Sequence, residues 1–419
     1  MVDSAGSAAV PEGEESHGTA DGAISAPPRR KSDLRLVGGT RWWQRLPENF
    51  YRYPDGTEVD THHPLKVHGS AFADRMLRTG LASLITIGMA PSLLSSARAR
   101  RERNLLPLYR ELADRGDADA VFAPPPNGVT LRQRDGSRSE WQPRGIAVRQ
   151  LSFESPYVPL HPEMRRSWRA QDCNRVARAQ HWMHPRGARP TLVFVHGFML
   201  DAYAANSWGF SLPWLFKKGY DILLVTLPFH GARREAGHPF SGYGFVSGGM
   251  AHLNESMLQS IQELRIWLDY LFEQGAPQVG ISGLSLGGYL SALLAAVDPR
   301  LAFCIPNSPV VAPVDMAMEW QPIRPLLKTV MWRDKVRISE FRHGMALHSP
   351  LTYAPKVDPE RLLVIGGAGD RVTPPRFVRL LHQHWRGSEL HWFPGNHIVH
   401  LHQANYLRMM KRFMDRHTG

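Results

Sequence analysis

The sequence predicts an α/β protein with a mostly parallel sheet that helices cover on both faces. From residue 190 onward, short apolar segments of strand length alternate with longer segments of helical periodicity. The short segments are almost continuously apolar, which is typical of strands buried on both faces. Strands that alternate with helices indicate βαβ units, whose connecting helices cover the sheet.

The elements follow one another along the chain at regular intervals. Strands are expected over residues 129–133, 146–153, 175–183, 191–196, 222–227, 278–282, 301–305, 362–366 and 390–393, with a turn at Asp135-Gly136. Helices are expected over residues 250–272, 286–297 and 401–417. In the first of these helices, Leu258, Ile261, Leu264 and Leu268 recur every three or four residues, as in a helix with one buried face.

The chain before residue 145 differs in composition from the rest. Residues 1–34 are rich in Ala, Gly, Ser, Pro and Glu, and we expect a disordered tail. Residues 35–144 are predicted to form an N-terminal helical extension on or near the core of a domain over residues 145–419. Aromatic residues between 35 and 65 predict an ordered irregular segment, and residues 68–115 predict a helix that breaks near Pro91.

An apolar run from Leu81 to Leu94 is followed by arginines at positions 98, 100, 101 and 103. The run has about 15 residues and contains Gly88 and Pro91, so it is shorter than the roughly 20 residues of a membrane span. One interpretation is a buried helix that packs on the main domain. The other is an interfacial anchor or a wall of a lipid-substrate tunnel, in which residues 81–103 make a peripheral membrane contact and the arginines face anionic headgroups.

The composition excludes several classes of protein. The 419 residues carry a formal net charge of +12, but the basic residues are mostly Arg spread along the chain, so we expect no nucleic-acid partner. Cys173 and Cys304 are too few for a disulfide framework or a cysteine-rich zinc module. The start of the chain is acidic and lacks the apolar core of a secretory signal. We therefore expect a cytoplasmic protein, peripheral to the inner membrane face if residues 81–103 bind lipid.

The candidate nucleophile is Ser285, within the pattern Gly283-Leu284-Ser285-Leu286-Gly287. Roughly one chain in five of this length would contain such a five-residue pattern by chance, so its context carries the argument. A strand is expected before the pattern and an apolar helix directly after it. A serine at that turn is held in a strained, exposed geometry at a helix N-terminus, and the two flanking glycines let strand and helix pack closely.

A nucleophilic serine needs a general base and an acid that orients the base. Asp370 follows a predicted strand in a glycine-rich loop, and His397 follows the last predicted strand. Both positions lie at carboxyl ends of strands, where functional groups gather in α/β sheets. His391, His400 and His402 are nearby competitors. His391 alternates within the strand, whereas His400 and His402 lie at or inside the final helix, and His400 is the main alternative base.

Acyl transfer also needs two N–H donors for the developing oxyanion. The N–H of Leu286 is the first, and the second is expected from the loop after the strand over residues 191–196. Phe198 is the preferred donor in that loop and Met199 the alternative. Gly197 would let the backbone approach the substrate, and His196 is expected to brace the loop through hydrogen bonds.

The loop over residues 227–234 also follows a predicted buried strand and should border the site. His230, Arg233 and Arg234 are therefore candidate substrate-binding residues. The two arginines could hold a substrate carboxylate or phosphate. Alternatively, they tie the loop to Glu235 or to the cap.

Residues from about 145 to 419 resemble the α/β-hydrolase superfamily. The resemblance rests on His196-Gly197, the elbow at 283–287, Gly369-Asp370 and Asn396-His397, in that order. It implies a twisted eight-stranded sheet, a Ser285, Asp370 and His397 triad, and a cap inserted after the sixth strand, over about residues 308–358. The segment over residues 227–234 is similar to a loop in a poorly characterised bacterial subgroup.

We therefore expect a serine hydrolase that cleaves a carboxylic ester or thioester through an acyl-enzyme, without a metal or organic cofactor. The His-x-x-His pattern at 397–400 lacks the carboxylates of a metal site, and no phosphate-binding glycine loop is present. Met316, Met318 and Trp320 in the expected cap favour a small-molecule or lipid ester with an apolar acyl chain. Two alternatives stay open: an acyltransferase with the same triad, and a catalytically silent binding protein. The sequence predicts no oligomeric state.

Overall fold

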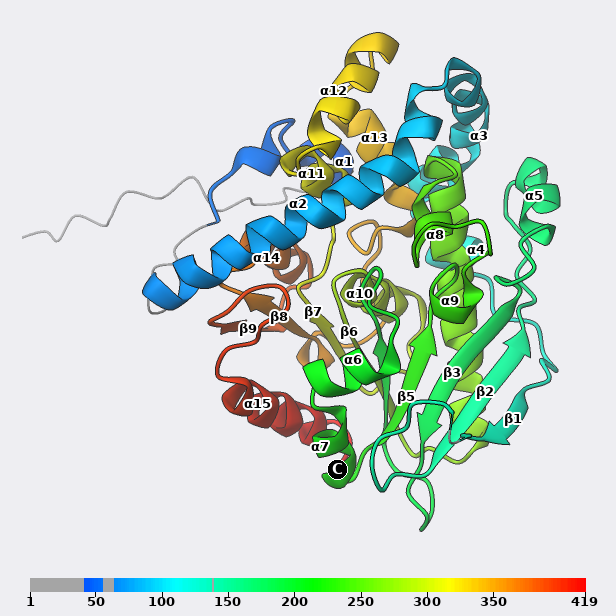
Figure 1. Cartoon of the computed structure of the whole chain (residues 1–419), viewed down its shortest axis with the longest axis vertical. Coiled ribbons are helices and arrows are strands. Elements are labelled where there is room, and N and C mark those ends of the chain that lie inside the picture. Colours follow the sequence, from blue (N-terminus) through cyan, green and yellow to red (C-terminus); the bar gives the residue numbers. More distant parts are fainter. Residues whose placement is uncertain (1–40, 56–63, 138) are drawn as a thin grey trace, which may run out of the picture. The chain divides into compact units, whose positions relative to one another are not determined.

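A nine-stranded sheet runs through the described part of the chain, residues 41–55, 64–137 and 139–419 of a computed structural model (Figure 1). The strand order is β1-β2-β3-β5-β4-β6-β7-β8-β9. The strands are β1 (Arg132–Asp135), β2 (Val148–Glu154), β3 (Val176–Trp182), β4 (Thr191–Val195), β5 (Asp221–Thr226), β6 (Val279–Leu284), β7 (Cys304–Asn307), β8 (Leu363–Gly367) and β9 (Glu389–Phe393). The implied number of eight strands was wrong, because the exposed four-residue β1 adds an edge strand.

The pairing of neighbouring strands changes from antiparallel to parallel at β5. Strands β1, β2, β3 and β5 pair antiparallel, whereas β5, β4, β6, β7, β8 and β9 pair in parallel. Val195 pairs with Gly283, and Gly367 pairs with Phe393. The carboxyl ends of β4, β6, β8 and β9 therefore lie along one edge of the sheet, where their loops can form a site.

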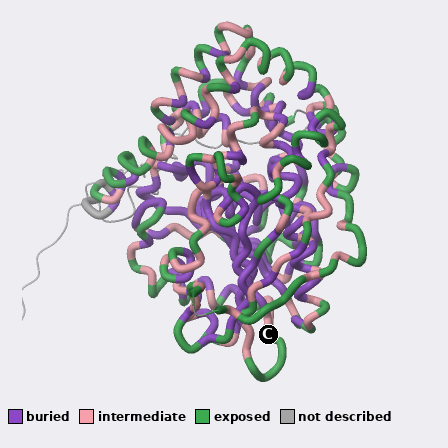
Figure 2. Tube along the Cα trace, turned by 45° about the vertical axis from the view of Figure 1, so that its right-hand side comes forward, coloured by how far each residue is buried: buried purple, intermediate pink, exposed green. Residues whose placement is uncertain are grey.

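Helices cover both faces of the sheet, as the alternating pattern predicts. They are α1 (Trp42–Arg45), α2 (Pro64–Leu94), α3 (Ser96–Arg115), α4 (Ala118–Val121), α5 (Arg165–Arg169), α6 (Tyr203–Gly209), α7 (Leu212–Lys217), α8 (Tyr243–Val246), α9 (Met250–Glu273), α10 (Leu286–Val297), α11 (Pro313–Glu319), α12 (Ile323–Asp334), α13 (Ile338–Gly344), α14 (Pro375–His384) and α15 (Gln403–Arg416). Leu192 and Phe194 of β4 join a core cluster with side chains of α7 and α15, while α10 packs on β4, β6 and β7. Figure 2 shows that buried residues concentrate in these central strands.

The region between β7 and β8 is helical, and it contains α11, α12 and α13. Helix α12 packs against α2, and α13 packs against α3. Their apolar side chains form a second core cluster that includes Ala82 of α2, Trp320 and Phe341. The N-terminal helices and the expected cap thus share one apolar core.

Helix α2 continues through Pro91, and the break that was predicted near this residue lies four residues later, at Ser95 between α2 and α3. The helix ends at Leu94, and Ser95 caps the next helix by accepting a hydrogen bond from the N–H of Arg98 at 3.3 Å. A proline removes one intrahelical hydrogen bond, which tertiary packing can offset. Here Gly88 packs against Val246 and Tyr243 of α8.

Two faces of α2 have different surroundings. Val67, Ala71, Asp74, Ala82 and Ser92 are buried at helical spacing. The opposite face carries the exposed side chains of Phe72, Met76, Ile87 and Leu94. An 18-residue window within Gly69–Leu94 has a mean hydropathy of 1.3, and 17% of that window is buried. By length and composition alone this helix could cross a membrane, whereas the run from Leu81 to Leu94 alone was expected to be too short for a span.

The predicted tail, residues 1–34, lies outside the described residues, as do residues 35–40 and 56–63 of the aromatic-rich segment. The described part of that segment forms α1 and a 3₁₀ turn at Phe50–Arg52. Trp43 stacks on His343 of α13 with ring centroids 4.9 Å apart, and Phe50 packs edge-on against Phe377 of α14. The segment is therefore ordered by burial of its aromatic rings, as its composition predicts.

Candidate active site

Ser285 occupies a tight turn between β6 and α10. Its backbone has φ +57° and ψ −111°, in a region that non-glycine residues adopt only when the surrounding structure imposes it. The N–H of Ser285 donates to the carbonyl oxygen of Asn307 at 2.9 Å, which helps to hold the turn. The side chain is 9% exposed at the N-terminus of a fully buried helix, as expected for a nucleophile elbow.

The glycines on both sides of Ser285 are required by close packing. A Cβ atom on Gly283 or on Gly287 would overlap the carbonyl oxygen of Val195 at the end of β4. The backbones of β4, β6 and α10 therefore meet at distances that only glycine permits. This packing explains why both flanking positions of the five-residue pattern are glycine, which the pattern alone could not show because it also occurs by chance.

His397 and Asp370 form a buried pair. Nδ1 of His397 lies 2.8 Å from Oδ2 of Asp370, and both side chains are buried. Oδ1 of Asp370 accepts hydrogen bonds from the N–H groups of Val372 and Thr373 at 2.9 and 2.7 Å. The carboxylate is thus fixed by its own loop, and its second oxygen orients the imidazole in the manner of a catalytic acid.

Backbone hydrogen bonds join the loops that carry this pair. The N–H of Ala368 donates to the carbonyl oxygen of Phe393 at 3.0 Å, and the N–H of Gly369 donates to that of Gly395 at 2.8 Å. The loop after β8 therefore cannot move independently of the loop after β9.

The charge of the imidazole is set by opposing effects. Burial alone would lower the pKa of His397, but the charge and hydrogen bond of Asp370, together with the charge of Asp74, outweigh it and raise this pKa above its usual value of 6.5. A base of raised pKa accepts a proton from a serine hydroxyl more readily than an unpaired histidine does.

His400, the alternative base, does not reach Asp370. Its ring packs against the rings of Phe393, Phe210 and Tyr406, with centroid separations of 4.3 to 5.4 Å. Burial lowers the pKa of His400 to about 4, and neither ring nitrogen has a hydrogen-bond partner within the described residues. The structure therefore pairs the acid with His397.

The loop after β4 lies directly against the nucleophile. A Cβ atom on Gly197 would lie 3.6 Å from Cβ of Ser285. Nδ1 of His196 lies 2.8 Å from the carbonyl oxygen of Gly197, and its Nε2 accepts a hydrogen bond from the N–H of Leu227 at 3.1 Å. His196 thus braces this loop against the loop after β5, in the role expected for it. Burial lowers its pKa, which favours the neutral ring that these bonds require.

The model of the family described as "Alpha/beta hydrolase family" matches residues 192–408, which is more than half of the chain. The chain belongs to this family. The chain is 29% identical over 293 residues to "Uncharacterized protein Rv2627c" of Mycobacterium tuberculosis (strain ATCC 25618 / H37Rv). That match covers 66% of this chain and 65% of the relative, so the chain spans just under two thirds of the length of the relative.

Two acetyl xylan esterases share the fold of this chain. The enzyme from Paenibacillus sp. R4 has a TM-score of 0.51 at 15% identity and covers 74% of this chain and 94% of its own. Acetyl xylan esterase 1 from Thermoanaerobacterium sp. JW/SL YS485 has a TM-score of 0.52 at 14% identity and covers 73% and 92%. At these identities the similarity shows the fold alone.

The prediction that Arg233 binds substrate was wrong. Its guanidinium is fully buried and forms a two-pronged ion pair with Glu263 of α9, with N–O distances of 2.6 and 2.7 Å. It also donates to the carbonyl oxygens of Thr226 and Asn174 at 3.0 and 2.7 Å. The alternative, a structural tie, is correct in kind, but the partner is Glu263 of α9 and neither Glu235 nor the expected cap.

His230 is also a packing residue, contrary to its assignment as a substrate contact. It is fully buried, and its Nδ1 lies 2.8 Å from the carbonyl oxygen of Pro228. Its ring packs edge-on against His196 and Phe198, and burial lowers its pKa well below the usual value. A neutral, enclosed imidazole supports the loop beneath Phe198. Arg234, in contrast, is exposed.

Sequence reasoning missed Asp74 of α2. This side chain is 1% exposed, and its Oδ2 accepts hydrogen bonds from the N–H groups of Arg371 at 2.8 Å and His397 at 3.0 Å. The signal was present as a single carboxylate near the start of a long apolar helix. An unpaired charge on such a helix is costly, so it points to a partner elsewhere in the chain.

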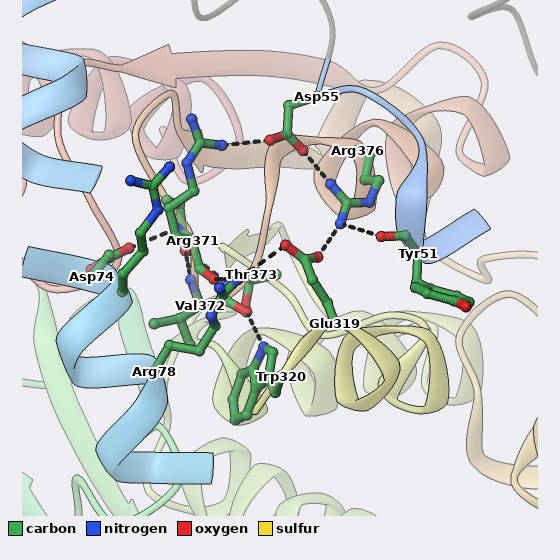
Figure 3. A network of polar contacts seen from close by, with 12 residues as sticks. Tyr51, Asp55, Asp74, Arg78, Glu319, Trp320, Arg371, Val372, Thr373 and Arg376 are labelled. Carbon is green, nitrogen blue, oxygen red and sulfur yellow. Dashed lines mark hydrogen bonds and ion pairs between the residues drawn. The ribbon is translucent and has the colours of Figure 1, made fainter. Parts of the chain in front are cut away.

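An ion-pair network surrounds the loop that carries Asp370 (Figure 3). Asp55 pairs with both Arg371 and Arg376, and Arg376 also pairs with Glu319 of α11. Arg78 of α2 donates to Glu319 at 3.0 Å and to the carbonyl oxygen of Arg371 at 3.1 Å. The network therefore joins the N-terminal segment, α2 and the helices between β7 and β8 to one active-site loop.

An apolar cavity of about 150 Å³ lies between α2, α9 and the helices that follow β7. Its lining includes Ile85 and Met89 of α2, Met250, Met316 and Trp320. Nε1 of Trp320 donates to the carbonyl oxygen of Val372 at 3.1 Å, and the N–H of Val372 donates to Asp370. One wall of the cavity is thus two hydrogen bonds from the candidate catalytic acid.

Proposed function

We propose that this hydrolase is a serine esterase that cleaves a carboxylic ester or thioester through an acyl-enzyme. The pairing of His397 with Asp370, on loops at the same sheet edge as Ser285 and its strained turn, carries the proposal. A serine at an elbow, a base of raised pKa and a fixed acid are the groups that nucleophilic acyl transfer requires.

In the proposed reaction, Oγ of Ser285 attacks the carbonyl carbon while Nε2 of His397 takes the hydroxyl proton. Asp370 holds the imidazole and stabilises its protonated form. The N–H groups of Phe198 and Leu286 stabilise the oxyanion. His397 then donates the proton to the departing alcohol or thiol, and an acyl-enzyme remains. Water, deprotonated by His397, attacks the acyl carbon and releases the carboxylic acid and the serine.

We propose that the apolar cavity receives the acyl chain of the substrate. The methionines among its lining residues have flexible side chains that adapt to chains of different shape. Its small volume suits a short or medium chain better than a long one. The cavity is walled partly by α2, which would make the N-terminal region part of the substrate site.

We further propose that the hydrolase is cytoplasmic and contacts the inner membrane face through residues 81–103. Ile87 and Leu94 are 59% and 52% exposed on the outer face of α2. Arg100 and Arg101 are exposed on the helix that follows. Exposed apolar groups beside arginines fit an interface with anionic headgroups. Such a surface would bring apolar esters to the site.

The decisive experiment compares the wild-type protein with Ser285→Ala and with a control, Ser167→Ala, whose hydroxyl donates to the carbonyl oxygen of Met164 on α5. A fluorophosphonate probe should label the wild type and the control but not Ser285→Ala. Hydrolysis of a p-nitrophenyl ester should fall by about 10⁶ in kcat for Ser285→Ala. Wild-type turnover in Ser285→Ala would overturn the proposal. If an added alcohol or thiol is acylated faster than the substrate is hydrolysed, the protein is instead an acyltransferase.

A further inference from the structure

Helix α2 inserts a second carboxylate beside the pair of His397 and Asp370. Oδ2 of Asp74 accepts hydrogen bonds from the N–H of Arg371, the residue after the acid, and from the N–H of His397 itself. The two donors belong to different loops, one after β8 and one after β9. A single oxygen atom therefore joins the loop of the candidate acid to the loop of the candidate base.

Other contacts fix α2 in this position. Nδ2 of Asn396 donates to the carbonyl oxygen of Ser70 at 3.0 Å. A Cβ atom on Gly369 would lie 3.0 Å from the carbonyl oxygen of Val67, so the first turns of α2 touch the loop of the acid. One turn beyond Asp74, Arg78 donates to the carbonyl oxygen of Arg371 at 3.1 Å (Figure 3). The carboxylate is thus held by its helix and does not reach the site by chance.

Asp74 affects the pKa of the candidate base, His397, as well as the position of its loop. Burial, with a smaller contribution from the charge of Asp370, raises the pKa of Asp74 to about 6, although the N–H donors and the charge of His397 oppose this. The ionised carboxylate in turn helps to raise the pKa of His397. His400 is the other titratable group that faces this imidazole, and it is neutral because burial lowers its pKa to about 4.

We propose that Asp74 is a positioning residue for the esterase reaction, which holds the loops of His397 and Asp370 together and favours the protonated imidazole. This inference rests on the proposed function. It also gives the N-terminal region a role, because Asp74 lies outside the residues 192–408 that match the family. The active centre of this chain would then be incomplete without α2.

The test uses Asp74→Asn, Asp74→Ala and a matched control, Glu102→Gln. Glu102 of α3 is also a carboxylate from the N-terminal helices with a raised pKa caused by burial, and it accepts a hydrogen bond from the N–H of Ala251 at 3.1 Å. It contacts the start of α9 and not the loops of the pair. The control therefore removes a comparable charge without touching the loops of His397 and Asp370.

We expect Asp74→Ala to lower kcat by about 10- to 100-fold with a small change in KM, as for lost supports of catalytic groups. Asp74→Asn keeps an acceptor oxygen and should recover part of that kcat. In Asp74→Asn the acidic limb of kcat/KM should move to lower pH, because loss of the negative charge of Asp74 lowers the pKa of His397. Glu102→Gln should keep the wild-type kcat and acidic limb. A wild-type acidic limb and kcat in Asp74→Asn, or an equal shift in Glu102→Gln, would overturn the proposal.

A spectroscopic titration separates this inference from the proposed function. The imidazole resonances of His397, assigned by their absence in His397→Gln, should titrate at lower pH in Asp74→Asn than in the wild type. This readout needs no substrate, so an inactive wild type would refute the esterase and still test the effect of Asp74. An unchanged titration of His397 in folded Asp74→Asn would overturn the inference even if the enzyme is an esterase.

Discussion

Nδ1 of His397 lies 2.8 Å from Oδ2 of Asp370, while Oδ1 of the same carboxylate accepts two backbone N–H bonds. The carboxylate therefore has two separable tasks, one toward its loop and one toward the imidazole. An asparagine can keep the first task, because its amide oxygen accepts hydrogen bonds. It cannot perform the second, because an amide NH₂ opposite Nδ1 would favour the wrong tautomer of the imidazole.

We predict that Asp370→Asn lowers kcat for an activated ester by about 10⁴-fold while the protein stays folded. Initial rates and the thermal midpoint Tm, measured by circular dichroism, check both parts of this prediction. His400→Gln is the matched control, since the alternative base should not affect kcat to a comparable degree. Loss of kcat in His400→Gln, with full activity in Asp370→Asn, would indicate that His400 and not His397 is the general base.

The pH dependence of kcat/KM should show an acidic limb above pH 6.5. The general base must be neutral to take the proton of Ser285, and the raised pKa of His397 keeps it protonated to a higher pH than usual. Activity should therefore rise with pH through this limb as the imidazole loses its proton, and it should fall as the pH is lowered through the pKa of His397. Steady-state rates from pH 5 to 9, with circular dichroism to exclude unfolding, provide the measurement. A limb centred well below pH 6 would contradict the assignment of the base.

Replacement of Arg233 should lower stability and not substrate specificity. Arg233→Leu leaves Glu263 charged and buried without its partner, a change that costs about 3–5 kcal/mol of the free energy of unfolding. Arg234→Ala, at the exposed neighbour, should change it by less than about 0.5 kcal/mol. Urea denaturation checks both variants. A stable Arg233→Leu with a selective loss of activity on acidic esters would restore the role in substrate binding.

The value of kcat/KM should increase with the length of the acyl chain, because a longer chain buries more apolar surface in the cavity. Each methylene that enters the cavity should raise kcat/KM about fourfold, up to the length at which the cavity is full. Ala317→Phe, which fills the cavity, should remove this increase but preserve hydrolysis of acetyl esters. The control, Lys328→Phe on the exposed side of α12, should leave the increase with chain length unchanged. A series of p-nitrophenyl esters from C2 to C12 measures the effect. A clear preference of the wild type for acetyl would refute the acyl pocket.

Binding to lipid vesicles should depend on the outer face of α2. We predict that the wild type co-sediments with phosphatidylglycerol vesicles at low salt and is released at high salt, since part of the attraction is electrostatic. Ile87→Glu with Leu94→Glu should weaken this binding at least about tenfold, because charge enters the apolar surface. The control is Trp208→Glu, at a side chain that is 86% exposed on α6. Failure of the wild type to bind, or equal loss in the control, would argue against the proposed membrane contact.

The fold was predictable because its signals are local. Apolar strands that alternate with helices, a glycine on each side of Ser285 and acids or bases just after strands can all be recognised within short windows. The helix over residues 286–297 was predicted with the bounds of α10, since its apolar composition and the elbow define both ends. The edge strand β1 was predicted near its position, although the resemblance implied one strand fewer.

The predictions that were wrong concern partners that are distant in sequence. Arg233 meets Glu263 thirty residues later in the sequence. His230 is titratable in principle, but its burial depends on the rings of Phe198 and Phe245. No spacing rule identifies such contacts, because they depend on how the loops and helices pack.

The sequence by itself determined the class of fold and the residues that meet at the carboxyl edge of the sheet, since parallel strands direct their following loops to one edge. Only the tertiary structure decided that His397 and not His400 pairs with Asp370, and that a helix from the N-terminal region places Asp74 against both loops. The physical reason is that backbone pattern is local, whereas burial, charge and hydrogen-bond partners are properties of the packed chain.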